Sequence, residues 1–482
     1  MLRNIILSTA LFLGASIQAQ DRTDALRYSQ ESLWGSARYV AMGGAFGSLG
    51  ANATSTSHNP AGIATHTTNE FSGSLNFIDI ENQSSYHSSD AFDKKSILSI
   101  PNLNYINANV FDPEQIGDWN RFNFGIGYNK LDDYNRNIYV SAEQNEHSFS
   151  DSLLNYAQGT AFDDLDIFKE YLAFFTCLID TIGGVSSYYS PVNGQMNKKQ
   201  TFNSQRSGSK NEFYISFGTA YQNKLFLGAT IGFPSIAYKE VNTISESNFS
   251  GSSQDTILLN YFKYNTNLHV TGSGINLKLG LIYKLDDNIR YGFALHTPTY
   301  YELNEEYWAS MKTDFIDEDK SRYSESYLAL IDYGLNTPFK MINSLSFVIN
   351  KKAIISVDHE YLNYSTANLV SDFYDFSNAN EDIKKSYTST SNLKLGGELR
   401  IHPQLSLRGG YAYYGSPFAN NLNDASKEYV TMGMGLKVNQ YFFDLTLVNS
   451  VSKKDLFIYD GAPEATINTE KSQLLLSAGF KF

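Results

Sequence analysis

Hydrophobic and polar residues alternate along most of the chain after residue 69. In one segment the alternating positions hold Phe122, Phe124, Ile126 and Tyr128 on one side and Asn123, Gly125, Gly127 and Asn129 on the other. The same period of two recurs at 213–221, 277–283, 393–401 and 430–436. Because successive side chains of a β-strand point to opposite faces, this pattern predicts amphipathic strands. Such strands suit either a soluble sandwich or the wall of a membrane barrel.

The connections between the predicted strands alternate in length. Short polar turns are expected at 222–224, 286–288, 350–352, 402–404 and 439–441, and longer charged loops separate them. Outer-membrane barrels have short periplasmic turns and long external loops, whereas a sandwich has no reason to sort its connections by end. We therefore predict an all-β fold, a transmembrane antiparallel β-barrel of about 14 strands at residues 69–482. Its longest external loops are expected at 131–211 and 304–334.

Both ends of the chain indicate insertion into the outer membrane of a bacterium. Residues 1–19 combine the basic Arg3 with a short apolar run and a small residue, Ala19, which predicts a cleavable signal peptide. The alternative is a buried N-terminal helix. The last predicted strand is amphipathic and ends in Phe482. That ending is typical of the strand that the barrel-assembly machinery reads, although an ordinary edge strand would look the same.

Residues 20–68 lack the alternation and are rich in small side chains. The segment is too long for a tail and too rich in glycine for a stable helical domain. Small side chains allow close backbone packing, so we predict a compact plug, or hatch, inside the barrel. The glycines do not match a phosphate-binding loop, because no Gly-Lys-Ser/Thr ending and no G-x-G-x-x-G spacing are present.

Composition excludes several classes of function. A formal net charge of −13 and a pI of about 5.1 argue against nucleic acid as a partner. Cys177 is the single cysteine, which excludes a disulfide framework and a cysteine-rich zinc site. The eight histidines are scattered without metal-binding spacing, so we expect no metal and no cofactor. No catalytic motif is present, and we expect a protein that is not an enzyme; a membrane lipase with a spatially assembled Ser/His pair is the alternative.

Short motifs in the predicted hatch resemble a known family. Residues 35–38 read Gly-Ser-Ala-Arg, residues 41–46 read Ala-Met-Gly-Gly-Ala-Phe and residues 59–62 read Asn-Pro-Ala-Gly. This stretch is similar to the N-terminal hatch of the FadL-type (OmpP1/FadL/TodX) outer-membrane transporters of hydrophobic compounds. The residues that carry the resemblance are Gly43, Gly44, Phe46, Asn59, Pro60 and Ala61. Thr297-Pro298 and Thr337-Pro338 also resemble Thr/Ser-Pro stretches of that family's barrel.

The resemblance implies passive uptake of long-chain fatty acids or similar small hydrophobic molecules. External loops would capture the ligand, a pocket in the lumen would hold it, and a gap beside an inward kink of the third strand would release it sideways. In this chain the third predicted strand contains Gly125 and Gly127, which permit such a kink. The alternative is that these glycines face the lumen and make room for the hatch.

Two apolar segments in the longest loops are candidates for the outer capture site. Helical spacing places Phe168, Tyr171, Leu172 and Phe175 together, and Trp308, Met311 and Phe315 are expected to supply the opposing wall. A short helix that only caps the barrel is the alternative. Arg400 or Arg408 is a candidate anchor for a ligand carboxylate. The competing function is a general porin or a structural or adhesive barrel. Expected partners are therefore a hydrophobic small molecule, the membrane lipids and the assembly machinery.

Overall fold

The computed structural model describes residues 22–111, 118–183, 186–190, 198–249, 259–316, 321–421 and 423–482. The predicted signal peptide at 1–19 lies outside the described residues. Within the described residues, no helix has the length and apolar character needed to cross a bilayer.

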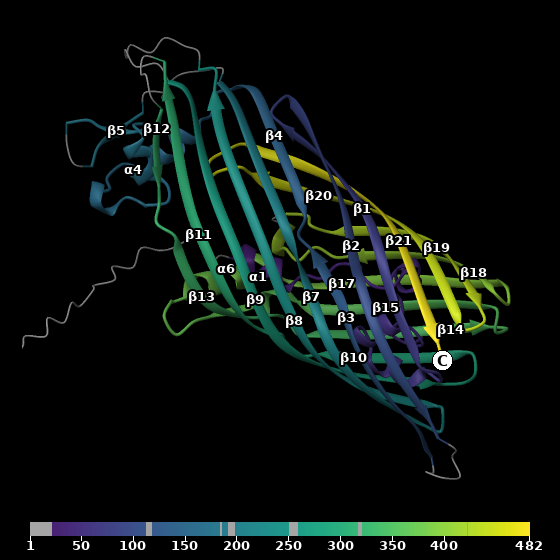
Figure 1. Ribbon diagram of the computed structural model, residues 1–482. Coiled ribbons are helices and arrows are strands. Elements are labelled where there is room, and N and C mark those ends of the chain that lie inside the picture. Colours follow the sequence, from purple (N-terminus) through teal and green to yellow (C-terminus); the bar gives the residue numbers. More distant parts are fainter. Residues whose placement is uncertain are drawn as a thin grey trace, which may run out of the picture.

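One antiparallel sheet closes on itself to form the body of the molecule (Figure 1). Its strands are β1 (Glu70–Tyr86), β2 (Ser89–Val110), β3 (Trp119–Asp133), β4 (Arg136–Asn145), β7 (Lys198–Tyr221), β8 (Leu225–Ser247), β9 (Leu259–Lys284), β10 (Ile289–His296), β11 (Tyr300–Phe315), β12 (Arg322–Glu325), β13 (Ala329–Asn336), β14 (Lys340–Ile349), β15 (Ala353–Asn363), β16 (Asn368–Val370), β17 (Ser389–His402), β18 (Leu405–Tyr414), β19 (Lys427–Val438), β20 (Tyr441–Phe457) and β21 (Glu464–Lys481).

The described strands fill 14 positions around the wall. Four positions hold more than one segment in succession: β3 with β4, β10 with β11, β12 with β13 and β14, and β15 with β16. β1 pairs with β21 from Glu70↔Lys481 to Tyr86↔Ala465 and closes the barrel. The prediction of an all-β barrel of about 14 strands is confirmed.

Two neighbouring strands are interrupted at the same level by the Thr-Pro stretches. Pro298 separates β10 from β11, and Pro338 separates β13 from β14. Proline has no N–H to give to a sheet ladder, so each strand must break there. Thr337 N donates to Thr299 O at 3.0 Å, and Thr299 N donates to the Thr337 hydroxyl at 2.9 Å. These bonds carry the pairing across the interruption.

The outward face of the wall changes from apolar to polar at a defined level. On β8 the exposed Ile231 and Phe233 give way to the exposed Ser235, and on β9 Ile275 gives way to Ser273. This change marks the upper limit of the lipid-facing band, because lipid favours aliphatic and aromatic side chains on the outside.

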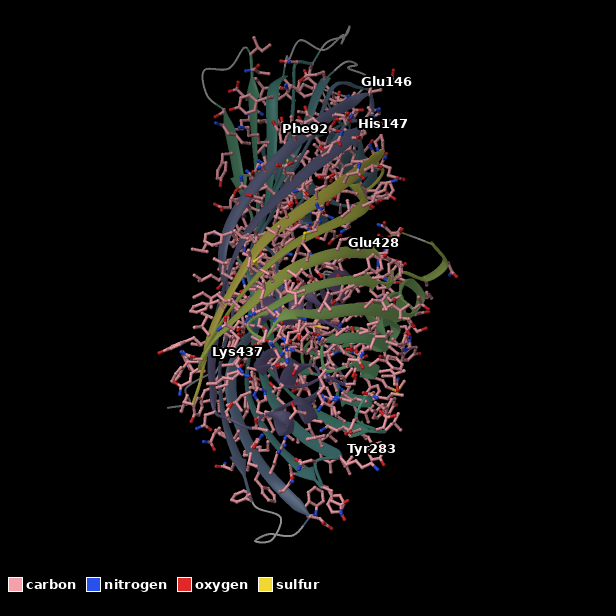
Figure 2. All side chains as sticks on the ribbon, turned by 90° about the vertical axis from the view of Figure 1, so that its right-hand side faces the viewer. Phe92, Glu146, His147, Tyr283, Glu428 and Lys437 are labelled. Carbon is pink, nitrogen blue, oxygen red and sulfur yellow. The ribbon has the colours of Figure 1, made fainter. Side chains whose placement is uncertain are left out.

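Half of the barrel continues well beyond that limit. β7, β8 and β9 have 24, 23 and 26 residues, whereas β14 and β18 have 10 each. In Figure 1 these strands and β11 rise far past β14, β17 and β18, and Figure 2 places Phe92, Glu146 and His147 at the tall end and Tyr283 and Lys437 toward the other.

Much of the sequence expected as external loop is therefore strand. The range 131–211 contains β4 and the first half of β7, and 304–334 contains most of β11 and β13. The outward face there is polar, because it lies in water rather than in lipid. That polar face made these segments look like loops.

The segment before β1 forms a hatch inside the barrel, as predicted. It comprises α1 (Arg22–Ser29), α2 (Ala37–Ala41) and two 3₁₀ turns, η1 (Ala53–Ser57) and η2 (Pro60–Thr65). It hydrogen-bonds to strands on opposite sides of the wall. The Thr446 hydroxyl of β20 donates to Ala37 O, the Asn123 amide of β3 donates to Ile63 O, and the Asn59 amide donates to Leu281 O of β9.

Glycines of the wall make room for the hatch. A Cβ added to Gly228 would lie 2.3 Å from Pro60 C, one added to Gly280 2.0 Å from Asn59 Oδ1, and one added to Gly410 2.2 Å from Gly43 N. Because such distances exclude any larger residue, the hatch touches the barrel backbone directly. A small plug in the lumen is thus what the glycine-rich sequence encodes.

The hatch motifs hold their own turns. Gly43 and Gly44 have φ of +61° and +78°, a conformation that favours glycine, and they end α2 against β17 and β18. Phe46 is fully buried, and the Asn59 side chain accepts from Ala61 N to cap the turn that begins at Pro60. The motif residues therefore fix the fold of the hatch.

A small helical cap covers the inner face of the tall wall. It contains α4 (Phe149–Ala157), η3 (Phe162–Asp164), α5 (Glu170–Phe175) and the short hairpin β5 (Asp180–Thr181) with β6 (Tyr188–Tyr189). α6 (Ser377–Ser386) lies lower, near α1, and Arg22 Nη1 donates to the Ser386 hydroxyl at 2.9 Å. The cap and α1 share the largest apolar core of the molecule.

Candidate functional site

The third strand of the wall leaves its neighbour before the end of the sheet. β3 pairs with β2 only from Arg121↔Val110 to Asn129↔Asn102. Beyond that point β4 continues the ladder with β7, while residues 89–99 of β2 pair with β1 alone in the described part of the chain. The ladder is therefore open between β2 and β4, and its lower end lies beside Leu98 and Ile100 of β2, whose exposed apolar side chains continue the lipid-facing surface there.

Side chains from the lumen face of β1 cover the freed edge of β4. The Asn82 amide donates to Asn137 O at 2.6 Å, and the Ser84 hydroxyl donates to Tyr139 O at 2.5 Å. β4 thus lies on the inner side of β1 and β2. The Lys95 ammonium of β2 reaches Arg206 O on β7 at 2.9 Å. The opening is bridged by side chains instead of backbone bonds.

The predicted kink glycines do not form this break. Gly125 and Gly127 lie in the regular part of β3, paired to β2 on one side and to β7 on the other. A Cβ on Gly125 would lie 2.8 Å from Ile63 Cδ1, so this glycine makes room for the hatch, which is the alternative stated above. The strand is interrupted at Tyr134 and Asn135 instead.

A cavity of about 270 Å³ lies in the lumen directly behind the break. Residues of the break (132–136), α1, β7, β8 and β19–β21 line it. Tyr28, Tyr134 and Tyr238 meet at one side, with ring centroids 5.3 to 6.3 Å apart. Ile80 and Leu26 add apolar surface, and several Arg and Lys side chains add positive charge. The cavity is therefore amphipathic.

The outer cluster brings together most of the residues expected to bind ligand. Leu172 and Met311 are fully buried, and Phe168 and Phe315 are nearly so, all in the same core. Phe168 packs against Tyr307 and Tyr327 with ring centroids at 5.1 and 5.5 Å. The rings of Tyr171 and Phe175 pack in a tilted arrangement with centroids 4.5 Å apart, and half of Phe175 remains exposed.

Trp308 is not part of that cluster. Tyr307, Ala309 and Met311 of β11 face the core, so strand alternation turns Trp308 to the outer side of the wall. This segment was expected to be a loop, where side chains need not alternate between two faces, but in the structure it is part of the strand β11. The opposing wall of the cluster is supplied by Met311, Phe315 and Tyr307.

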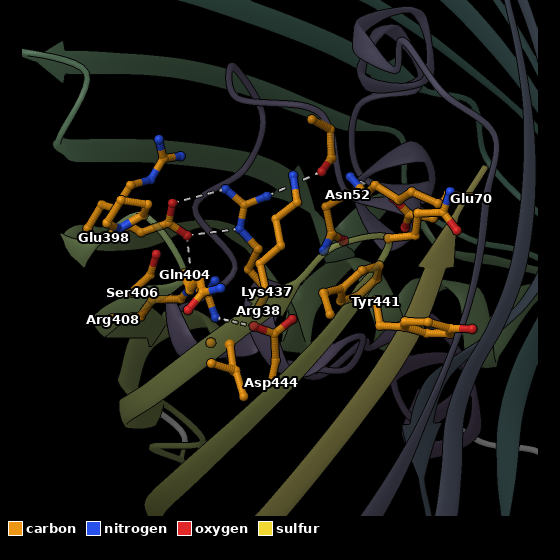
Figure 3. A pocket seen from close by; sticks show the side chains of 18 residues that line it. Arg38, Asn52, Glu70, Glu398, Gln404, Ser406, Arg408, Lys437, Tyr441 and Asp444 are labelled. Carbon is orange, nitrogen blue, oxygen red and sulfur yellow. Dashed lines mark hydrogen bonds and ion pairs between the residues drawn. The ribbon is translucent and has the colours of Figure 1, made fainter.

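A second, polar cavity of about 210 Å³ lies beside the short turns, between the hatch and β17–β21 (Figure 3). Arg38 of the hatch binds both carboxylate oxygens of Glu398, at 2.9 and 3.2 Å. Arg408 contacts Glu398 at 2.7 Å and Asp444 at 2.5 Å, so its guanidinium is already engaged with two carboxylates. Arg400 lines the same cavity and is exposed. The network links the hatch to the wall.

Buried histidines of the hatch are held neutral. His58 Nε2 donates to Asp358 Oδ2 at 2.9 Å, and Gly47 N donates to the same oxygen at 2.8 Å. Burial lowers the pKa of His58, and the ammonium of Lys394 lowers it further, against the opposing effect of Asp358. Burial also lowers the pKa of His66, to about 4.

Sequence reasoning missed the break and the cavity behind it. The cavity draws residues from eight segments far apart in sequence. Signals for the break were present in the turn-forming residues Asp133 and Asn135 and in Pro101, which lies on β2 where the ladder with β3 ends.

Comparison with known proteins agrees with this architecture. Residues 219–440 match the family model for outer membrane protein transport protein (OMPP1/FadL/TodX). The fold matches the Pseudomonas putida toluene transporter TodX (14% identity, TM-score 0.52) and a Pseudomonas aeruginosa FadL homologue (11%, TM-score 0.55), in each case over 94% of this chain and 99% of the other. The CymD monoaromatic hydrocarbon channel matches over the same shares at 12% identity and TM-score 0.50. No curated protein sequence matches significantly.

The closed barrel with its lumen filled by its own N-terminal segment defines a bacterial outer-membrane protein. The family model and the shared fold confirm the resemblance seen in the hatch. Residues 219–440 are therefore similar to the outer membrane transport proteins of the OMPP1/FadL/TodX family, and the chain as a whole shares their fold.

Proposed function

We propose that this protein takes up long-chain fatty acids or similar amphipathic molecules passively and releases them sideways. The observation that carries the proposal is the open ladder between β2 and β4, which lies beside a lumen cavity and above a lumen filled by the hatch. A ligand in that cavity has a lateral opening next to it and a packed plug beneath it.

The outer cluster suits the first step, capture from water. Removing apolar surface from water is worth about 25 cal/mol per Å², so an aromatic surface collects apolar ligands without an energy source. Phe175 is half exposed and packs against the Tyr171 ring, next to the buried Phe168. This gives an accessible aromatic surface that continues into the core.

The cavity behind the break suits the second step. It combines apolar surface from Leu26, Ile80 and Tyr238 with cationic side chains, as an amphipathic anion requires. Arg408 is engaged with Glu398 and Asp444, so the proposed anchor for the head group moves from Arg408 and Arg400 to the cations of this cavity.

Locking the hatch to the wall tests the lateral route. A Cβ on Gly218 would lie 3.2 Å from Ala64 Cβ, close to the roughly 3.5–4.5 Å of a disulfide. We expect a variant with Ala64→Cys and Gly218→Cys to form a disulfide between the hatch and β7. The same variant carries Ile63→Ala, which makes room for the new side chain, and Cys177→Ser, which removes the native thiol. Uptake of a radiolabelled fatty acid by expressing cells should be equal in the oxidised and reduced states of this one variant.

The reduced protein is the matched control, because it carries the same substitutions. Uptake that disappears on oxidation and returns on reduction would mean that ligand passes the hatch, and the lateral route would be wrong.

A further inference from the structure

Four cations surround one carboxylate in the cavity behind the break. Arg27, Arg136, Arg206 and Lys454 form this group, which we call the upper basic cluster. Arg206 Nη2 contacts Glu240 at 2.8 Å, and Arg27 Nη2 contacts the same carboxylate at 3.6 Å. Arg27 also pairs with Asp24. Glu240 is therefore shared between two guanidinium groups.

The other two members of the upper basic cluster form no ion pair with a carboxylate of the described chain. Arg136 donates to neutral oxygens, those of Asn82 and Thr469. The charged groups that act most strongly on the Lys454 ammonium are the guanidinium groups of Arg206, Arg136 and Arg27. A single carboxylate, that of Glu240, acts in the opposite direction. Lys454 thus lies among like charges.

A second group of cations lies at the adjoining side of the cavity. Lys130 pairs with Asp133 at 2.7 Å, and the Lys471 ammonium lies 4.7 Å from the ring centroid of Trp34. Lys427 also lines the cavity, and like Lys471 it has no ion pair within the described ranges. Asp132 is the second acid here. The seven basic side chains named here outnumber the carboxylates of Asp24, Asp132, Asp133 and Glu240 by three, and the exposed Lys453 also lines the cavity.

Such an excess is unfavourable away from bulk water unless an anion completes it. A fatty-acid carboxylate supplies one negative charge, whereas a phosphate monoester supplies about two and presents three acceptor oxygens. Guanidinium groups also match phosphate geometry with paired N–H donors. The charge balance therefore favours a doubly charged head group over a carboxylate.

We propose that this cavity binds the phosphate monoester head of a single-chain amphiphile. The inference rests on the proposed function, because the acyl chain would follow the same route. The cavity volume of about 270 Å³ accommodates a head group, and Leu26, Ile80 and Tyr238 offer apolar surface to the first part of the chain. The break at Tyr134 and Asn135 lies next to that surface.

Calorimetric titration of the purified protein in a non-ionic detergent tests this assignment. The probes are oleoyl glycerol phosphate, oleate, monoolein and inorganic phosphate. We expect oleoyl glycerol phosphate to bind about tenfold more tightly than oleate, since charged hydrogen bonds are individually worth that much. Arg136→Gln and Lys454→Gln should each remove most of that preference while oleate still binds, which also shows that the variants fold.

Lys239→Gln is the matched control, because Lys239 is an exposed cation on the outer face of β8 and should leave every affinity unchanged. Equal affinity for oleoyl glycerol phosphate and oleate, or a preference that both variants retain, would overturn the inference and leave the proposed uptake standing. Failure of all three lipids to bind would contradict the proposed function itself. Inorganic phosphate that binds as tightly as the lipid would assign the site to free phosphate and overturn its assignment to a lipid head.

Discussion

Two buried histidines connect the hatch to the pH of the medium. His66 is buried at the end of the hatch, and its ring lies 3.7 Å from Glu70. Its pKa of about 4 in the folded protein is below the usual 6.5. A lowered pKa means that the unfolded hatch binds protons more readily than the docked one. Docking is therefore fully favoured above about pH 6.5 and weakens as the pH falls toward 4.

We expect acid to loosen the hatch by about 3 kcal/mol through His66 alone. With Trp119 and Trp308 replaced by Phe, the fluorescence of the buried Trp34 reports docking, and it should change between pH 6.5 and 4. His66→Gln should reduce that change. His402→Gln, at an exposed turn, should not. A response that is identical with and without His66 would contradict this account.

Adjacent glycines on β18 allow a matched test of hatch packing. A Cβ on Gly410 would lie 2.2 Å from Gly43 N, whereas the nearest atom to one on Gly409 is Thr431 O at 3.9 Å. Gly410→Val should therefore displace the hatch and give ion conductance in a planar bilayer. Gly409→Val should leave the barrel silent, like the unchanged protein. Conductance from the unchanged protein would favour the general porin instead.

At the residue scale, sequence reasoning found the parts that local chemistry determines. Gly43, Asn59 and Pro60 were assigned to the hatch by resemblance, and the turn and cap that they form in the structure agree with local preferences. The basic cavity could not be found in this way, because Arg27, Arg136 and Lys454 come together only when distant strands close. Arg408 looked free in the sequence, since its partner Asp444 lies on a strand two positions away around the wall.

At the scale of elements, α5 and β11 form the capture surface. Phe168→Ser removes a ring that packs against Tyr307 and Tyr327, and Phe175→Ser removes the half-exposed ring. Each should weaken binding of a fluorescent fatty acid about tenfold, the usual effect of losing an aromatic anchor. The measurement is a fluorescence titration of purified protein.

Trp308→Ser is the control for the capture surface, because Trp308 lies on the outer side of the same strand and should leave the affinity unchanged. If neither Phe168→Ser nor Phe175→Ser alters the titration, α5 is only a cap on the barrel and ligand enters elsewhere.

The break in the third strand shows the limit of reasoning from residue type. Glycine permits a kink, but Gly125 meets Ile63 of the hatch and stays in the ladder. The interruption at Tyr134 and Asn135 combines a local turn, in which Asn135 N donates to Asp133 Oδ1 at 3.0 Å, with tertiary contacts. The Asn82 and Ser84 side chains bind the backbone of β4, and Tyr134 packs against Tyr28 of α1. None of these is visible within the strand itself.

At the scale of the whole molecule, period-two alternation and connection length were sufficient to predict the barrel and its approximate strand number. They were not sufficient for its height. The tall part of β7–β9 is polar outside, and its inner face, covered by α4 and α5, combines apolar side chains such as Phe202, Ile244 and Phe262 with buried polar ones such as Gln200 and Glu246. Where the wall lies in water, its outward side chains are polar instead of apolar. The period-two alternation therefore continues above the membrane, and only the composition of the outward positions changes.

The seam of the barrel has a consequence for assembly. Asn69, the residue before β1, exchanges two backbone hydrogen bonds with Phe482, at 3.0 and 3.1 Å. The hatch is thus attached at the one place where the first and last strands meet. Bulky hatch side chains such as Phe46 and Tyr39 cannot be threaded into a cylinder that is already sealed. Folding of the leader segment must therefore precede or accompany the final zipping of the two terminal strands, so a mutation that slows hatch folding would delay maturation of the entire protein.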